Sequence, residues 1–131
     1  MALKMVGKGS QYAYATLAAD GEPLDGAKNY RMRLPADAPA ADFWSVTVYD
    51  PQTRSELQTG QPLPGRSSRD ALVYNDDGSV DIVFGPDEPA QLATNWLQTV
   101  PGKGWFTLLR LYGPLEAWFD GTWKPGDVEA D

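Results

Sequence analysis

Short runs rich in aromatic and β-branched residues recur along the chain between closely spaced turn signals. Pairs such as Asp20-Gly21, Asp77-Gly78 and Pro101-Gly102 separate the runs, and 13 Gly and 11 Pro leave little room for long helices. This pattern predicts an all-β sandwich of about seven or more strands in two packed sheets, with at most one short helix near residues 87–98. The expected strands are Tyr12–Leu17, Asn29–Leu34, Phe43–Tyr49, Leu72–Tyr74, Ser79–Phe84 and Trp105–Tyr112.

Alternation of apolar and polar positions within the runs predicts which side chains face the core. The expected core sets are Trp44/Val46/Val48, Tyr30/Met32/Leu34 and Val80/Ile82/Phe84. The opposite faces carry a polar and aromatic set: Arg31, Arg33, Ser45, Thr47, Tyr49, Asp81 and Val83.

One run differs from the others because both of its faces are mostly apolar. The run Trp105–Tyr112 therefore reads as a central strand, and Arg110 and Tyr112 interrupt one face of it. A lone buried guanidinium is costly, so we expect Arg110 to be a partly buried ion-pair donor.

The composition excludes most of the common catalytic and metal-binding side chains. The 131 residues fit a single domain over residues 1–131, and they include no Cys and no His. Disulfides, thiol nucleophiles, imidazole or thiolate metal sites and histidine bases are therefore excluded. No Gly-x-Ser-x-Gly elbow and no Ser-x-x-Lys sequence occurs, so we do not expect an enzyme, a metal site or a cofactor.

Charge and hydropathy exclude two classes of partner. Eleven basic residues against eighteen acidic ones give a net charge of -7, which disfavours binding to nucleic acid and to anionic membranes. No apolar run approaches the roughly 20 residues that span a bilayer, so membrane insertion is not expected.

Short sequence motifs, in the same order along nearly the whole chain, resemble those of a known bacterial family, domain of unknown function 1214. The motifs are Gly7–Tyr12, Pro23-Leu24-Asp25-Gly26 with Asn29-Tyr30, Phe43–Asp50, Thr53-Arg54-Ser55, Asp77-Gly78-Ser79, Phe84-Gly85-Pro86, Asn95–Trp105, Arg110–Pro114 and Trp123. One departure lies just before Asn95, where Gln91-Leu92-Ala93-Thr94 stands in place of the family's Gly-Lys-Glu.

The resemblance carries expectations about architecture and context. It implies a jelly-roll-like antiparallel β-sandwich and no assigned activity. Such domains usually form the C-terminal half of two-domain proteins whose N-terminal half is domain of unknown function 1254, so that domain is an expected partner. The resemblance also implies a periplasmic or cell-envelope location.

Several groups of polar residues are candidate sites, each with a structural alternative. The oxygens of Asn75, Asp77, Ser79 and Asp81 alternate as in a calcium loop, but the loop lacks the sixth-position glycine and the twelfth-position Glu, so a plain hairpin turn is expected. The acids near strand ends are Asp50, Glu116 and Asp120, a weak signal for a two-carboxylate hydrolase. Candidate ligand-binding residues on the polar and aromatic faces are Arg33, Ser45, Tyr49, Trp96, Arg110 and Tyr112.

These observations favour a non-catalytic β-sandwich module with a structural or interaction role in a bacterial envelope protein. The alternatives are a carbohydrate-binding or small-ligand-binding module and, third, a carboxylate-dependent hydrolase. Because the aromatic supply exceeds what a small core needs, we also expect Trp118, Phe119 or Trp123 at the surface and a self-associating chain.

Overall fold

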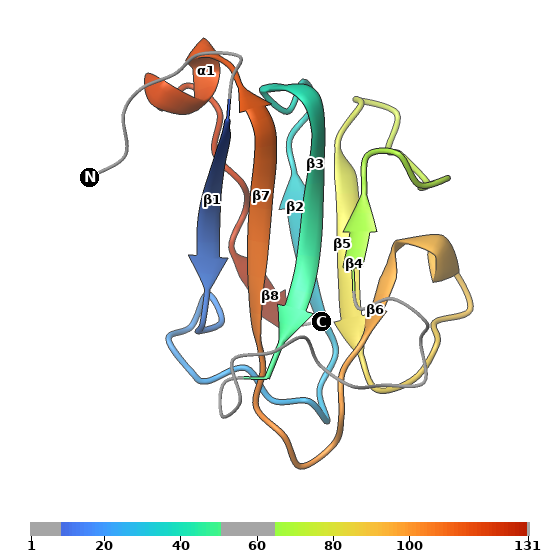
Figure 1. Cartoon of the computed structure of the whole chain (residues 1–131). Coiled ribbons are helices and arrows are strands. Elements are labelled where there is room, and N and C mark those ends of the chain that lie inside the picture. Colours follow the sequence, from blue (N-terminus) through green and yellow to red (C-terminus); the bar gives the residue numbers. More distant parts are fainter. Residues whose placement is uncertain (1–8, 51–64, 131) are drawn as a thin grey trace.

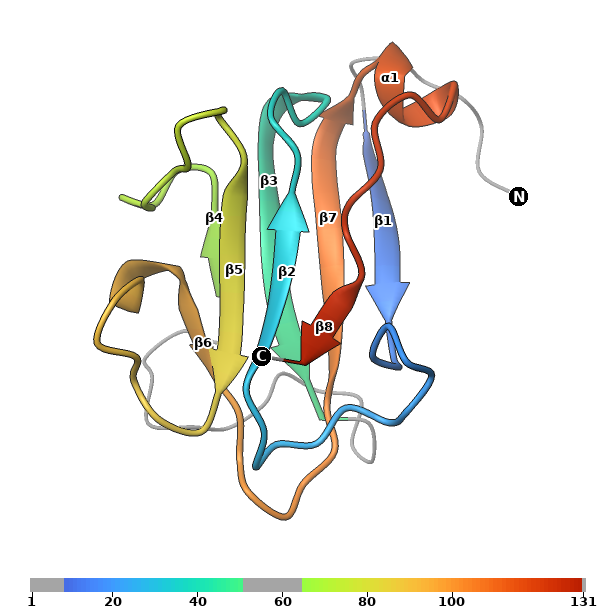
Figure 2. The same ribbon diagram turned by 180° about the vertical axis from the view of Figure 1, so that it is seen from behind.

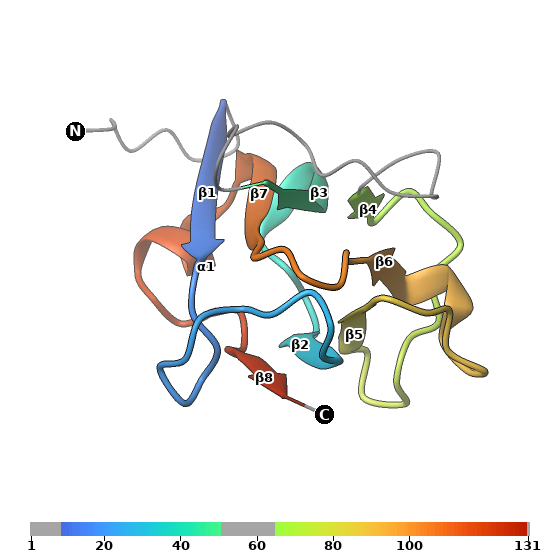
Figure 3. The ribbon, with the colours of Figure 1, turned by 90° about the horizontal axis from the view of Figure 1, so that it is seen from below.

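The computed structural model describes residues 9–50 and 65–130 and shows a sandwich of two four-stranded sheets. Figures 1 and 2 show the sandwich from its two faces, and Figure 3 shows the two layers from below. The first sheet has the order β1-β7-β3-β4, and the second has the order β6-β5-β2-β8. The predicted all-β sandwich is confirmed. Its jelly-roll form stays a prediction from the family resemblance.

The strands of the first sheet pair antiparallel throughout. They are β1 (Ser10–Ala15), β7 (Phe106–Pro114), β3 (Ala40–Tyr49) and β4 (Gly65–Ser67). The long strands β3 and β7 share the most extensive pairing and form the centre of this sheet, as the apolar pattern of Trp105–Tyr112 predicts.

The second sheet contains one parallel pair, which the prediction of an antiparallel sandwich did not include. Its strands are β6 (Trp96–Gln98), β5 (Val80–Gly85), β2 (Tyr30–Leu34) and β8 (Val128–Ala130). β5 pairs antiparallel with β2 but parallel with β6. The connection from β5 to β6 is long enough to cross over and return in the same direction.

Helical structure in the described residues is limited to two short segments. A 3₁₀ turn, η1 (Ala93–Asn95), precedes β6, and a single α-helical turn, α1 (Glu116–Phe119), follows β7. The expected turn of helix within 87–98 is thus a 3₁₀ turn followed by a strand. No helix in the described part of the chain is long and apolar enough to cross a membrane.

The expected strand Leu72–Tyr74 is wrong, although the turn that follows it is present. Tyr74 forms one isolated bridge with Val80, and Asn75 closes the turn with a 2.8 Å bond from its N–H to the Ser79 carbonyl. The backbone of Val73 bonds to the Asn95 side chain instead of to a neighbouring strand. The Asn95 side chain therefore takes the place of the strand-to-strand hydrogen bonds that the alternation predicts here.

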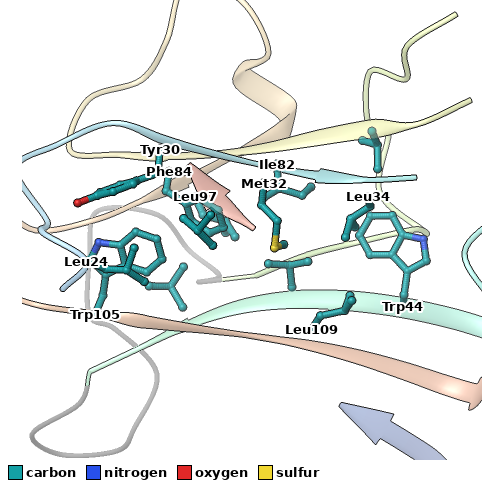
Figure 4. Packing of buried hydrophobic residues seen from close by; sticks show 14 of the residues in the cluster. Leu24, Tyr30, Met32, Leu34, Trp44, Ile82, Phe84, Leu97, Trp105 and Leu109 are labelled. Atoms are coloured by element: carbon teal, nitrogen blue, oxygen red, sulfur yellow. The ribbon is translucent and has the colours of Figure 1, made fainter. Parts of the chain in front are cut away.

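The core lies between the inner faces of the two sheets, where the alternation places it (Figure 4). Val46, Val48, Ile82 and Leu97 are fully buried. The larger buried side chains of this core are Tyr30, Met32, Leu34, Trp44, Phe84, Trp105, Leu109 and Leu111. Aromatic rings fill the end near Trp105, and Trp44 packs at the other end.

Arg66 links the two sheets at the β4 and β6 edge of the sandwich. Its Nε–H donates to the Trp96 carbonyl at 3.0 Å, and one terminal N–H donates to the Ala93 carbonyl at 3.4 Å. A charged donor on backbone carbonyls makes a stronger bond than a neutral one. The sequence analysis did not single out this residue, because a three-residue strand shows no alternation.

Candidate functional site

Four of the six sequence-predicted site residues lie together on the outer face of the first sheet. Ser45 of β3 pairs with Arg110 of β7, and Tyr12 of β1 pairs with the same arginine on its other side. Tyr112 and Tyr49 follow on this face at the two ends of the strands. The alternation along β3 and β7 therefore brings these side chains onto one surface.

Aromatic rings dominate that surface and contact each other across the strands. The rings of Phe43 and Tyr112 stack with centroids 4.2 Å apart, and those of Tyr49 and Phe106 stack at 5.2 Å. On β1 the rings of Tyr12 and Tyr14 meet edge to face at 5.2 Å, and Tyr14 reaches Phe106 at 6.2 Å. We call these six rings the aromatic face.

The outermost rings of the aromatic face are open to solvent. Tyr14 is 61% exposed, more than any other large hydrophobic side chain in the described part of the chain, and Tyr12 is 52% exposed. Sequence analysis placed both residues in a strand but did not single them out as exposed rings. The available signal was their spacing of two residues, which places both rings on the same side of the strand.

Arg110 is half-buried, as expected, but its partner is not the carboxylate that the sequence predicted. Among the described residues, its guanidinium donates to the Tyr112 hydroxyl at 3.3 Å and makes no ion pair. This hydrogen bond raises the pKa of Arg110 above its ordinary value. The outer rather than inner orientation of the side chain explains the difference, because the guanidinium stays in reach of water.

A second arginine lies against the aromatic face. The guanidinium carbon of Arg69 sits 4.2 Å from the centroid of the Phe43 ring, which is cation–π distance. Cations and ring faces therefore alternate along this surface, and it can contact both apolar and anionic groups.

The remaining two predicted site residues, Arg33 and Trp96, lie on the second sheet. Trp96 is nearly buried and its indole N–H donates to the Gly85 carbonyl at 3.0 Å. A hollow of about 540 Å³ lies beside it, lined among others by Asn29, Arg31 and Glu88. The six candidate residues therefore lie on two surfaces, one on each sheet.

Arg33 holds a buried carboxylate together with Arg31. Its Nε–H and a terminal N–H donate to the two oxygens of Asp81 at 2.8 and 3.2 Å, and Arg31 adds a bond of 3.1 Å. Asp81 is only 3% exposed, whereas the side chains of the two arginines are 42% and 58% exposed. The two arginines thus hold and neutralise the charge of the buried Asp81 carboxylate on the outside of the second sheet.

We expect this cluster to make stability dependent on acid. The Arg33 guanidinium lowers the pKa of Asp81, so the contribution of Asp81 is present above the unfolded pKa of about 4 and is lost as pH falls through the lower folded value. Asp81→Asn should lower the free energy of unfolding by about 1–2 kcal/mol at neutral pH, a modest value because both arginines remain partly solvated.

Urea unfolding of the wild type and of Asp81→Asn between pH 7 and pH 2 tests this expectation. The loss in the variant should shrink below about pH 4, where the wild-type carboxyl becomes protonated. Asp42→Asn, a change at an exposed strand carboxylate, is the control. A loss at Asp81 that stays constant over the whole pH range would contradict the assignment.

The acidic hairpin uses its oxygens within the turn. Asp77 Oδ1 accepts bonds from the Ser79 N–H at 2.9 Å and from its hydroxyl at 2.6 Å, and the hydroxyl bond lowers the pKa of Asp77. Asp81 is bound by the two arginines. In the described part of the chain, no group of three or more acidic residues is arranged to hold a metal ion.

The three candidate catalytic carboxylates do not form one site. Asp50 follows the last residue of β3 and pairs with Lys103 at 3.5 Å. Glu116 and Asp120 lie at α1, beside the start of β3. Figure 1 shows α1 at the opposite end of the sandwich from the end of β3. Ten strand residues separate these ends by roughly 30 Å, far more than the 5–10 Å that a glycosidase pair needs.

The tryptophans near turns are mostly structural. Trp123 is buried and donates its indole N–H to the Pro35 carbonyl at 3.1 Å, and Trp118 packs half-buried against the core. Phe119 is also half-buried. The expectation that these rings supply the exposed aromatic surface is therefore wrong for Trp123, and Tyr12 and Tyr14 supply the most exposed rings instead.

Comparison with known proteins fits this fold. A family model described as protein of unknown function (DUF1214) matches residues 9–116. The chain belongs to this family. The predicted motifs Phe43–Asp50, Thr53-Arg54-Ser55 and Asn95–Trp105 fall within the match, and Gly7–Tyr12 falls within it from Gly9 onward. Trp123 lies beyond the matched range, and Thr53-Arg54-Ser55 lies outside the residues that the structure describes.

Two solved structures resemble the DUF1214 chain over 93% of its length. One is the VPA0106 protein from Vibrio parahaemolyticus, with a TM-score of 0.80 and 26% identity. The other is a putative uncharacterized protein from Burkholderia cenocepacia, with a TM-score of 0.58 and 18% identity. The chain spans only 30% and 28% of the length of those proteins. No protein with a curated description matches it.

Proposed function

We propose that this DUF1214 chain is a non-catalytic interaction module that contacts another polypeptide through its aromatic face, within a bacterial cell-envelope protein. The observation that carries the proposal is the exposure of Tyr12 and Tyr14 at the edge of the aromatic face. Tyrosines and arginines are enriched at the centres of protein interfaces, because large rigid rings lose little entropy on contact. The envelope location rests on the family resemblance.

The length of the related proteins supports a polypeptide as the occupant. In the VPA0106 protein the matched domain is under a third of the chain, so most of that protein lies outside the sandwich. A contact between domains of such a protein needs a partly apolar surface on each. The aromatic face, with Arg69 and Arg110 beside the rings, has the mixed character of such an interface.

Carbohydrate binding is the second candidate, and the same face supports it. Exposed tyrosine rings can stack on sugar rings, and Arg110 and Ser45 stand next to them as possible hydrogen-bonding groups. A carboxylate-dependent hydrolase has no comparable support. Asp50 lies at the opposite end of the sandwich from Glu116 and Asp120. Of the two acids at α1, Asp120 accepts hydrogen bonds from the N–H and the hydroxyl of Thr122 within its own turn.

A binding experiment with two arms distinguishes the two candidates. The chain is titrated by calorimetry with the part of the VPA0106 protein that lies outside the match, and separately with a panel of oligosaccharides. We expect binding in the polypeptide arm, and a Tyr14→Ser change should weaken it roughly tenfold or more, as truncation of a central interface ring does.

Tyr74→Ser is the matched control, because Tyr74 is 47% exposed but is not one of the six rings of the aromatic face. Equal losses at Tyr14 and Tyr74 would argue against the aromatic face as the contact surface. Binding only to oligosaccharides, with the same sensitivity to Tyr14→Ser, would favour the second candidate. Binding in neither arm would contradict both.

A further inference from the structure

β1 is one of the two edge strands of the first sheet, and its outer side is open among the described residues. β1 pairs only with β7, and Figures 1 and 2 both show it as the outermost strand of its sheet. Its inward-facing residues Gln11, Ala13 and Ala15 are only half-buried, which agrees with an uncovered edge.

The register identifies which backbone groups of β1 face away from β7. The Gly113 N–H donates to the Gly9 carbonyl at 2.8 Å, so residues 9 and 113 form a hydrogen-bonded pair. In antiparallel pairing, bonded and non-bonded pairs alternate. Gln11, Ala13 and Ala15 are therefore bonded to β7, and the N–H and C=O groups of Ser10, Tyr12 and Tyr14 point outward.

This edge lacks the devices that usually prevent pairing with another strand. Charged residues, prolines and bulges protect natural sheet edges. β1 reads SQYAYA, with no charge and no proline, and its register with β7 is continuous. The other edge strands are only three residues long, and two of them, β4 and β8, carry Arg66 and Glu129. β6 also carries no charge, but it offers half the length of β1.

We propose that two copies of the chain associate by antiparallel pairing of β1 with β1 about a two-fold axis at Tyr12. This inference goes beyond the proposed function, because it uses the backbone edge of β1 rather than the aromatic face. Ser10 of one copy then opposes Tyr14 of the other, and the two Tyr12 residues oppose each other.

The outward groups of β1 are self-complementary in this register. A two-fold axis pairs residues whose numbers have a constant sum, and only outward residues can bond across the new edge. Centring the axis on Tyr12 engages all three outward residues in three mutual pairs, each able to exchange both N–H···O bonds. The result is one eight-stranded sheet in which the two aromatic faces join.

The charge of the chain affects both where two copies can meet and how strongly they associate. The chain has a net charge of -7, so two copies repel each other over most of their surface. β1 itself carries no charged residue, so no like charges meet at the junction. The dimer should therefore form more readily as salt screens the longer-range repulsion.

Single cysteines test the register, because the native chain has none. In the proposed dimer the Cα atoms of the two residues at position 12 lie about 5.5 Å apart, within disulfide range. The two residues at position 10 lie roughly 14 Å apart, four positions out of register. Under mild oxidation we expect Tyr12→Cys to cross-link efficiently, and Ser10→Cys, which is equally exposed on the strand, not to cross-link.

Proline tests whether the backbone carries the contact. Tyr12→Pro removes an outward N–H but no bond to β7, whereas Tyr12→Thr removes the ring and keeps the N–H. Each proline removes one donor from each copy, so Tyr12→Pro should weaken dimerisation roughly 30-fold more than Tyr12→Thr. Sedimentation at micromolar concentration in low and moderate salt measures this, and circular dichroism verifies that both variants keep the fold.

Three other outcomes of these experiments would contradict the edge pairing. A wild-type chain that stays monomeric at both salt concentrations, or equal cross-linking at positions 10 and 12, rules out this register. Equal weakening by Tyr12→Pro and Tyr12→Thr would show that the rings, not the edge, hold the dimer. The proposed interaction module can survive those results, because the calorimetric titration with Tyr14→Ser tests it independently.

Discussion

Replacing Trp105 by Ala is expected to lower the free energy of unfolding by about 3–5 kcal/mol. Trp105 is only 3% exposed, its ring stacks on Phe84 at 4.7 Å, and it meets Tyr30 edge to face at 5.6 Å. The three rings come from β2, β5 and the residue before β7, so they connect the two sheets at one end of the core (Figure 4). Alanine would leave a cavity that the rigid strands around it cannot close.

A second substitution at the same position separates packing from hydrogen bonding. The Trp105 indole N–H is buried and has no hydrogen-bond partner among the described residues. Trp105→Phe keeps an aromatic ring and removes this unpaired donor, so it should cost less than half as much as Trp105→Ala. Tyr74→Ala, at an exposed ring, should cost under about 1 kcal/mol.

Urea unfolding with a shared slope measures all three changes. If Trp105→Phe is as destabilising as Trp105→Ala, the stacking of the three rings is not what stabilises this end of the core. If Trp105→Ala costs no more than Tyr74→Ala, the aromatic cluster does not bridge the sheets energetically.

The strands that could be predicted are those long enough to alternate. β2, β3, β5 and β7 each bury every second residue on the core side, and their expected inward residues, such as Val46 and Ile82, are buried. β4, β6 and β8 have three residues each. Alternation over three positions is not distinguishable from chance, and these strands form because a longer neighbour offers a free edge.

Alternation within single strands predicted only part of the candidate site, namely the residues of β3 and β7 that face the same way. Ser45, Tyr49, Arg110 and Tyr112 fall on one surface because β3 and β7 are partners with a regular register. Arg33 and Trp96 fall on the other sheet. Which strands share a sheet depends on pairings between distant residues, such as Arg33 with Asp81, and the period of a single strand carries no information on them.

Arg110 shows the same limit at the level of one side chain. Its place in an apolar strand correctly indicated partial burial, but not the direction of the side chain. An inward arginine would need a carboxylate, whereas an outward one beside Tyr112 is satisfied by a hydroxyl and water. When both faces of a strand are apolar, the position of the second sheet decides which face points to the core.

Asn95 is the residue whose loss should most disturb the loops beside the second sheet. It is fully buried, and its amide N–H groups donate to the carbonyls of Val73 and Asp81, both at 2.9 Å. Its Oδ1 accepts the Val73 N–H at 2.9 Å. One side chain thus holds the residues before the hairpin turn against β5, where the expected strand pairing does not form.

We expect Asn95→Ala to lower the free energy of unfolding by about 2–4 kcal/mol, because three backbone groups lose their partners and water reaches only part of the site. Asn95→Asp keeps the acceptor for Val73 but places a carboxylate against two carbonyls, so its cost should be largest at neutral pH and fall in acid as the carboxyl becomes neutral. Asn75→Ala, at a turn asparagine whose Nδ2–H donates to the Ser79 hydroxyl, should cost under about 1 kcal/mol.

Hydrogen exchange at the Val73 amide gives the local measurement that accompanies urea unfolding. In the wild type this N–H is bonded to Asn95 although the Val73 side chain is 52% exposed, so its protection depends on a single side chain. Asn95→Ala should bring its exchange close to that of an open loop, whereas exchange at the amides of the β2–β5 ladder should speed up only by the factor that corresponds to the loss of global stability. Unchanged protection at Val73 in the alanine variant would mean that another group holds this segment against β5.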